Sequence, residues 1–263
     1  MKLYLSKIKE ILSLKELRIF PSYLAYNFIL ALIPMLTVLI LITSLLSIST
    51  DSVTNLIREN IPNNIADIII NIISSKNYSL SVGFLNITTL YISSRGMYAL
   101  VEASDSLYKI NKRKVIQKRL KSIVILFLVI FSLIFLLFIP ILGSKILNLI
   151  NYNNTIKKEI ILIYKVLKWP LTFLIIFLNI KLIYIIAPSK KIKGREVNIG
   201  ALFTTTIWAL FTLAFGKYLN YFSKYDVLYG GLSSVVVLLI WLYVLSYILI
   251  LGIVINTKLY NNS

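Results

Sequence analysis

The chain of 263 residues contains no cysteine and no histidine, and only 10 of its residues are acidic. These absences exclude disulfides, cysteine nucleophiles, Cys/His zinc sites and Ser-His-Asp triads. Phosphodiester hydrolysis needs metal-binding acids or general acid–base groups, and the only close acidic pair in a plausible place is Glu102 with Asp105. We therefore expect no catalytic residue, no metal site, no cofactor and no enzymatic activity.

Charge is scarce as well. Charged residues make up 14% of the chain and hydrophobic residues 58%, with a mean hydropathy of +0.85. Soluble domains hold roughly 45–50% apolar residues, so this chain has more apolar surface than one soluble core can bury. The bilayer must therefore be part of its solvent. A net charge of +18 suggests nucleic acid in a soluble chain, but in a membrane protein it indicates basic cytoplasmic loops. We expect the lipid bilayer as a partner, and no nucleic acid.

A membrane helix needs about 20 mostly apolar residues, and six segments meet this requirement. They lie at about 22–48, 83–105, 122–143, 165–187, 198–217 and 229–256. The third ends near Pro140 and Gly143, and Pro188 closes the fourth. The chain is thus predicted to be all-α, a polytopic membrane helix bundle with about six transmembrane helices. It forms one integral membrane domain over residues 1–263.

The distribution of Lys and Arg predicts the orientation. If the N-terminus is inside, the inner segments carry 17 Lys and Arg, against 7 in the outer ones. These inner segments are 1–21, 106–121, 188–197 and 257–263. Positive charge collects on the cytoplasmic side, so we expect both termini, including the segment 1–21, to be cytoplasmic. Residues 1–21 lack the features of a cleavable signal peptide.

The outer segment 49–82 carries isoleucine, leucine and valine at helical spacing, and Pro62 divides it into halves too short to span the bilayer. We expect an outer amphipathic helical loop at the membrane interface. The alternative is an ordinary packing helix.

The second predicted span carries charges that membrane helices rarely hold. An α-helix turns by about 100° per residue, so Arg95 and Glu102, seven residues apart, share a face. Tyr91, Tyr98 and Asp105 fall close to the same stripe. We call these five residues the polar stripe, and we expect it to face the bundle interior or water, as a candidate substrate pathway. The alternatives are an internal ion pair between helices or, for the two acids, simple solvation near the inner boundary.

Proline and glycine mark two further positions. Pro34 removes a backbone donor in the middle of the first span, which makes it a candidate hinge. A tolerated kink is the alternative, because proline is common in membrane helices. Gly230 and Gly231 begin the sixth span and allow close helix approach, so we assign them to helix packing.

Four blocks of sequence resemble the YihY/BrkB family of bacterial inner-membrane proteins. They are AYNFILALIPML (25–36), SSRGMYALVEASDSLYKIN with the basic KRKVIQKRLKS (93–122), KIKGREVNIGALF (191–203) and YGGLSSVVVLLIWLYVLSYILILGIVIN (229–256). The last block ends in a G-x-x-x-N pattern, Gly252 and Asn256, which we also assign to helix packing. The family often has an acidic residue before that asparagine, where this chain has Val254 and Ile255.

The resemblance implies a six-helix protein of the bacterial cytoplasmic membrane, in a family whose members have carried ribonuclease, virulence and transporter labels. The inward Arg95, the Pro34 break and the lack of a catalytic set favour a transporter or permease for an anionic or lipid-linked solute. One alternative is a non-transporting scaffold or envelope-assembly factor that uses 49–82 as its partner surface. Another is a membrane-surface enzyme that uses Glu102 and Asp105.

Overall fold

The computed structural model describes residues 15–45, 51, 54–55, 57–58, 66–67, 70, 83–110, 114–149, 154–221 and 233–261, with the backbone alone in some helical segments. These residues form six long helices and no strand, which confirms the predicted all-helical fold. In chain order the helices are α2 (Lys15–Leu45), α5 (Gly83–Leu107), α6 (Val115–Leu149), α7 (Asn154–Ile186), α8 (Asn198–Tyr221) and α10 (Ser233–Asn261).

The apolar composition of these segments explains both the helices and their setting. Inside a bilayer every backbone N–H and C=O must bond within its own segment, and a helix does this. Three helices hold a described apolar window long enough to cross a membrane: Val166–Ile186, Asn198–Leu219 and Val235–Lys258. Half of the α10 window is buried by protein, against 17% of the α7 window. α10 is therefore central, whereas most of the α7 window is not covered by protein. The count of six spans stays a prediction.

Several helices are longer than the predicted spans, and α2 begins at Lys15 rather than near residue 22. The third predicted span ended near Pro140, but α6 continues through this residue to Leu149. The fourth was predicted to begin near residue 165, but α7 begins at Asn154 and contains Pro170. A hydropathy window detects only the length that crosses the hydrocarbon, and proline is tolerated within membrane helices. The predicted inner segment 106–121 correspondingly contains the first two turns of α6.

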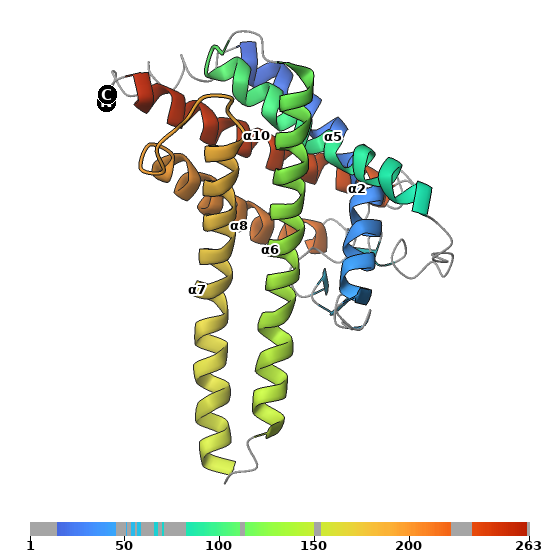
Figure 1. Cartoon of the computed structure of the whole chain (residues 1–263). Helices are drawn as coiled ribbons and strands as arrows, with labels where there is room; N and C mark the ends of the chain where they lie inside the picture. Colours follow the sequence, from blue (N-terminus) through green and yellow to red (C-terminus); the bar gives the residue numbers. More distant parts are fainter. Residues whose placement is uncertain are drawn as a thin grey trace, which may run out of the picture.

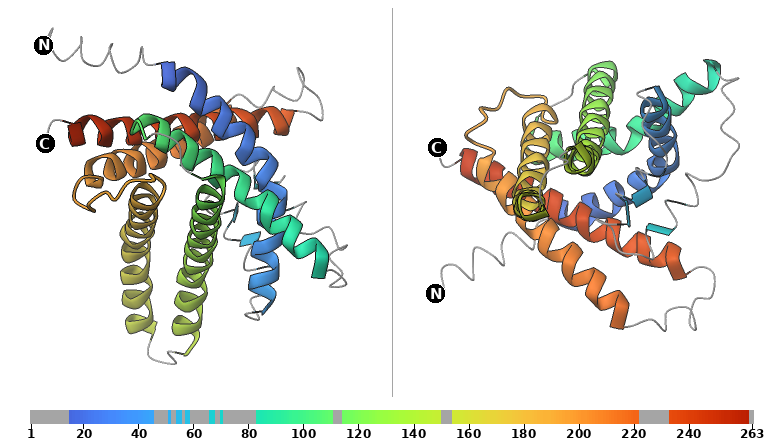
Figure 2. Two further views of the ribbon diagram at one scale, coloured as in Figure 1. Left: turned by 45° about the horizontal axis from the view of Figure 1, so that its top comes forward. Right: turned by 90° about the horizontal axis from the view of Figure 1, so that it is seen from below.

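The long helices α6 and α7 lie side by side as a hairpin that extends away from the other four helices (Figure 1, Figure 2). In Figure 1 the beginning of α2, the α5–α6 connection, the α7–α8 connection and the end of α10 all lie in the upper part of the molecule. The end of α6 and the beginning of α7 lie at the opposite end. The described parts of the four segments predicted to be cytoplasmic therefore share one end of the molecule.

Two apolar clusters hold the helices together. The larger is centred on α5 and α10, where Leu100, Val101 and Ile250 are at most 1% exposed. The smaller cluster joins the C-terminal half of α8 to the N-terminal half of α10, through residues such as Leu219 and Val237.

Three described apolar positions of the predicted outer loop contribute to the smaller cluster. Ile57 and Ala66 are buried there, and Ile70 packs against them. These inward positions match the packing-helix alternative, whereas the placement of 49–82 outside the membrane stays a prediction.

The C-terminus of α5 is closed by a Schellman turn. The Ile110 N–H donates to the Asp105 carbonyl at 2.9 Å, and the Lys109 N–H donates to the Ser106 carbonyl at 3.0 Å. Lys109 adopts the left-handed conformation that this turn requires, with φ of 53°. The turn ends α5 abruptly and sends the chain back towards α6.

Candidate anion-binding pocket

A pocket of about 280 Å³ lies where α5 packs between α2 and α6. It is lined by Tyr23, Tyr26, Asn27, Leu30, Arg95, Tyr98 and Arg119. The four α2 residues follow the i, i+3, i+4, i+7 spacing that places side chains on one helix face. Arg95 and Tyr98 are three residues apart on α5, and Arg119 comes from the second turn of α6. Three helices thus contribute two guanidinium groups, three phenol rings and an amide to one cavity.

Gly96 allows α2 to approach α5 closely beside this pocket. A Cβ atom at position 96 would lie 2.6 Å from a ring carbon of Phe28 and 3.5 Å from the Cβ of Ala31. Contacts under 3.0 Å do not occur in real packing, so only glycine fits without a shift of the ring. Gly96 adjoins Arg95, and the close approach of the helices brings the α2 tyrosines near the polar stripe.

The Arg119 guanidinium lies over two tyrosine rings of α5. Its guanidinium carbon lies 4.0 Å from the centroid of the Tyr91 ring and 4.8 Å from that of Tyr98. One of its N–H groups also donates to the Ser94 hydroxyl oxygen at 3.2 Å. Stacking on tyrosine stabilises the cation and restricts its rotamers. A single hydrogen bond leaves the rest of the five guanidinium donors to other acceptors.

Neither arginine of the pocket has an acidic partner among the described residues. The ion pairs of that part of the chain join Arg58 to Asp67 and Lys118 to Glu102. Arg95 is an exposed residue that lines the cavity, and it forms no hydrogen bond within the same part of the chain. The pocket therefore carries an excess of positive charge in a polar, aromatic surround, which is the chemistry that recognises an anion.

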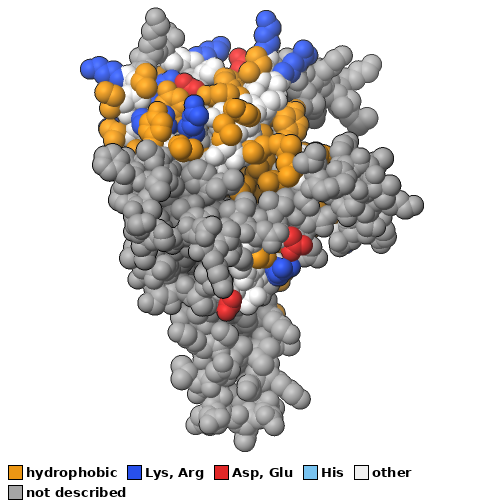
Figure 3. Space-filling model, turned by 90° about the vertical axis from the view of Figure 1, so that its right-hand side faces the viewer, with side chains coloured by type: hydrophobic (Ala, Val, Ile, Leu, Met, Phe, Trp, Pro, Cys, Tyr) orange, Lys and Arg blue, Asp and Glu red, His pale blue; other side chains and the backbone are white. Residues whose placement is uncertain are grey.

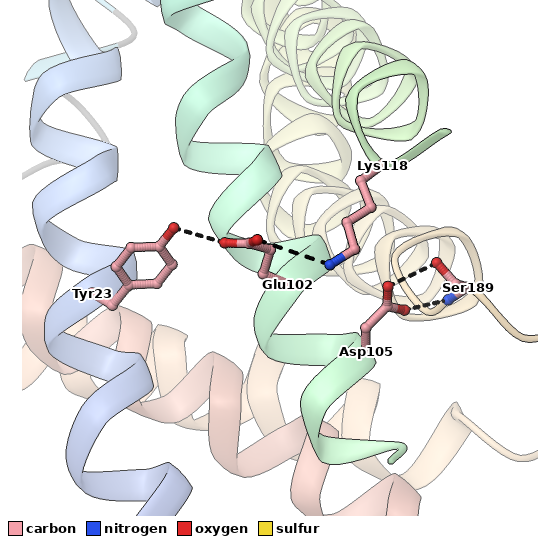
Figure 4. Close-up of polar contacts among 5 residues, drawn as sticks. All are labelled: Tyr23, Glu102, Asp105, Lys118 and Ser189. Atoms are coloured by element: carbon pink, nitrogen blue, oxygen red, sulfur yellow. Dashed lines mark hydrogen bonds and ion pairs between the residues drawn. The ribbon is translucent and has the colours of Figure 1, made fainter. Parts of the chain in front are cut away.

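Glu102 lies next to the pocket, and its charge is balanced by neighbours. The Tyr23 hydroxyl donates to one carboxylate oxygen at 2.8 Å, and the Lys118 ammonium lies 3.8 Å from the other (Figure 4). Tyr23 comes from α2 and Lys118 from α6, so Glu102 links the three helices that build the pocket. The ion-pair alternative for the polar stripe thus applies to Glu102 and Lys118, whereas Arg95 has no ion pair among the residues that the structure describes.

Asp105 lies apart from this pocket. Its carboxylate accepts hydrogen bonds from the Ser189 backbone N–H at 2.6 Å and from the Ser189 hydroxyl at 2.8 Å, and it is only 4% exposed (Figure 4). Three helical residues correspond to about 300°, so Asp105 is turned about 60° away from Glu102. That rotation directs it to the α7–α8 connection. The solvation alternative therefore does not apply to Asp105, which belongs to a different contact from the rest of the polar stripe.

Lys121 holds the same α7–α8 connection from α6. Its ammonium donates to the carbonyl oxygens of Ile186 at 2.9 Å and Pro188 at 2.5 Å. A lysine at this place satisfies carbonyls that a helix C-terminus leaves unpaired, and it interacts favourably with the helix dipole. Asp105 and Lys121 together fix the connection against the helices that frame the pocket.

The remaining predicted residues have the following places. Tyr91 is 53% exposed and reaches the pocket only by stacking on Arg119. Position 34 lies within the continuous helix α2, but its side chain is outside the described residues, as are Gly230 and Gly231.

Gly252 and Asn256 lie where α10 packs on α8. The Asn256 amide oxygen accepts a hydrogen bond from the Gly200 N–H at 2.9 Å. A Cβ atom at position 252 would collide with the Thr204 and Tyr184 hydroxyls. These contacts are far along the chain from the polar stripe.

Sequence reasoning missed the α2 face of the pocket and Arg119. The signal for α2 was the i, i+3, i+4, i+7 recurrence of Tyr23, Tyr26, Asn27 and Leu30. Nothing distinguished Arg119 from the other cations between 109 and 121, because its role depends on the position of α6 against α5.

Comparison with known proteins identifies relatives over the whole chain. The sequence model of a family described as virulence factor BrkB matches residues 14–263. A Bacillus subtilis protein named ribonuclease-like protein YfkH is 29% identical over 97% of this chain and 96% of its own. A UPF0761 membrane protein of Coxiella burnetii is 32% identical over 48% of this chain and 49% of its own. A UPF0761 membrane protein of Aliivibrio salmonicida is 23% identical over 97% of this chain and 83% of its own. No solved structure matches the chain.

Proposed function

The chain belongs to the virulence factor BrkB family of membrane proteins, and on that premise we propose that it is a permease-like protein of the bacterial cytoplasmic membrane. In this proposal both termini are cytoplasmic, and an anionic or lipid-linked solute binds between α2, α5 and α6. The observation that carries the proposal is the pairing of Arg95 and Arg119 in one cavity, with no acid opposite either of them in the described part of the chain.

The arrangement of the acids favours this proposal over an enzyme. Glu102 bonds to Tyr23 and Lys118, whereas Asp105 bonds to Ser189 on another element. The two carboxylates therefore do not face one reaction centre. The described residues also contain no cluster of three metal-ligating side chains, and the chain has no histidine. The ribonuclease-like name belongs to the Bacillus subtilis relative.

The scaffold alternative uses 49–82 as its partner surface. Two described apolar positions of this segment, Ile57 and Ala66, instead pack against α8 and α10 and give this alternative no support.

Transport is tested by electrometry on proteoliposomes that contain the full chain. Phosphate, sulfate, small carboxylates and short-chain anionic lipids are added in turn, and the displaced charge is recorded. At least one anion should give a signal that Arg95→Gln and Arg119→Gln abolish. Dithionite quenching of fluorescent anionic lipids covers the flipping of lipids. If every probe gives the same result with protein, with the double variant and with empty vesicles, the permease proposal fails.

A further inference from the structure

The charge of the pocket limits the class of anion that matches it. Arg95 and Arg119 supply two fixed positive charges, and Glu102 is already paired with Lys118. A phosphate monoester carries about −1.5 to −2 at pH 7, whereas a phosphodiester or a carboxylate carries only one negative charge. Guanidinium groups also bind phosphate oxygens in pairs of parallel hydrogen bonds. A phosphate monoester thus fits the charge and the donors better than a singly charged anion.

Apolar side chains are exposed at the rim of this polar pocket. Tyr26 and Leu30 line it on α2, yet they are 62% and 39% exposed at the protein surface. Leu120, next to Arg119 on α6, is 60% exposed. Hydrophobic side chains lie directly beside Lys and Arg side chains over the upper described part of the face in Figure 3. A ligand that meets this surface has both an anionic group and a hydrocarbon part.

The packing of the helices leaves the pocket open between α2 and α6. α5 packs extensively against both α2 and α6, but α2 and α6 barely contact each other. The pocket lies between them, with α5 behind it. A hydrocarbon chain can remain in the membrane beside Tyr26 and Leu30 while its head group lies between the two arginines.

We infer that the pocket binds the terminal phosphate monoester of an anionic lipid. The inference rests on the proposed function and names the ligand of the same site. Arg95 and Arg119 hold the phosphate oxygens, and the Tyr91 and Tyr98 rings keep Arg119 in place. Ser94 occupies one donor of Arg119, so the phosphate receives the others.

Binding to the purified full chain in detergent tests the inference, with dioctanoyl phosphatidic acid as the probe and native mass spectrometry or calorimetry as the readout. Dioctanoyl phosphatidylglycerol, a singly charged diester, should bind at least about tenfold more weakly, because one charge-assisted contact is lost. Dioctanoyl phosphatidylcholine should not bind. Inorganic phosphate separates a lipid site from a site for a free anion. If inorganic phosphate competes as well as the lipid, or if the diester binds equally, the inference is overturned.

Variants assign the binding to the pocket. Arg95→Gln and Arg119→Gln should each weaken phosphatidic acid binding by about tenfold or more. Arg195→Gln is the matched control, since Arg195 is exposed on the α7–α8 connection and does not line the pocket. Arg95→Lys keeps the charge, and therefore tests the site even if the glutamine variant does not fold. Equal affinity in all four variants contradicts the inference.

The permease proposal and the lipid-site inference can be contradicted independently of each other. If phosphatidic acid binds as described but no probe crosses the membrane, the permease proposal fails and the lipid site stands. If charge movement occurs with another anion and phosphatidic acid does not bind, the permease stands and the lipid site fails.

Discussion

The Asp105 carboxylate accepts two hydrogen bonds from Ser189, one from the backbone N–H at 2.6 Å and one from the hydroxyl at 2.8 Å. This pair joins the end of α5 to the α7–α8 connection, 84 positions later in the chain. Both partners are 4% exposed, so water could not replace these hydrogen bonds if a substitution removed them. The contact is structural, because it fixes the end of α5 to the α7–α8 connection.

We expect Asp105→Asn to destabilise the protein. The amide oxygen can still accept from the Ser189 N–H, but the amide NH2 can only donate to the Ser189 hydroxyl. The hydroxyl proton then loses its buried carboxylate acceptor, at a cost of about 1–3 kcal/mol. For a chain of this size the melting temperature in detergent should fall by several degrees. The control is Asp67→Asn, because the ion pair of Asp67 with Arg58 is more than half exposed, and such pairs contribute little. Equal melting temperatures for the two variants would contradict a structural role of Asp105.

Gly252→Ala should be more disruptive than its small change in size suggests. The added methyl group meets the Tyr184 and Thr204 hydroxyls, which are hydrogen-bonded to each other at 2.7 Å in the buried core. The Tyr184 hydroxyl also donates to the Leu249 carbonyl at 2.8 Å. Overpacking of this kind costs about 1–3 kcal/mol.

Fluorescence-detected size-exclusion chromatography after a heat step measures this loss. Gly194→Ala is the matched control, since a Cβ there lies 3.6 Å from its nearest neighbours, at ordinary contact distance. If both glycine variants retain the same folded fraction, the close contact between α8 and α10 does not limit stability.

Glu102→Gln should tighten anion binding. The introduced amide oxygen can still accept the Tyr23 hydrogen bond, but the negative charge beside the pocket is removed. A like charge a few ångströms from an anion costs on the order of 1 kcal/mol even when water screens it fully, so the affinity for phosphatidic acid should rise by at least about threefold to tenfold. Glu196→Gln on the α7–α8 connection should leave it unchanged. Weaker binding in Glu102→Gln would mean that Glu102 organises the pocket rather than opposing the ligand.

The helical fold follows from the sequence because the bilayer permits few alternatives. Long apolar runs must bond their own backbones, and the positions of five helices in the middle and end of the chain were predicted from this requirement. The ends of α6 and α7 were not, since residues 144–149 and 154–164 extend the helices without adding to the apolar windows. Helix length beyond the hydrocarbon depends on packing and not on hydropathy.

The pocket was predicted only on the α5 side. A helical wheel relates Arg95, Tyr98 and Glu102 because all three lie on one helix. It cannot show that Arg119 stacks on Tyr91, since that contact depends on how α6 crosses α5. The same wheel grouped Asp105 with the polar stripe, although a rotation of about 60° suffices to direct it to another neighbour. Residues that are only about 60° apart around one helix can therefore take part in two separate contacts.

The cysteine-free sequence allows a direct test of water access to the pocket. Single cysteines at Tyr98, which lines the pocket, and at Tyr91 should react with a charged, membrane-impermeant thiol reagent, because the two guanidinium groups require hydration or an anion. Phe131→Cys on α6 is the control: Phe131 is 69% exposed at the protein surface, and we expect lipid to cover it.

The side of labelling tests the proposed orientation in the same experiment. The pocket includes Arg119 from the second turn of α6, close to the end of the molecule where the predicted cytoplasmic segments gather. Inverted vesicles should therefore label at Tyr98→Cys and intact cells should not, and dioctanoyl phosphatidic acid should slow the reaction. Labelling only in intact cells would reverse the orientation. Lys191→Cys is the positive control for labelling. If it reacts while Tyr98→Cys stays unlabelled from both sides, the pocket is dry. Arg95 would then have a structural role in a protein that does not transport.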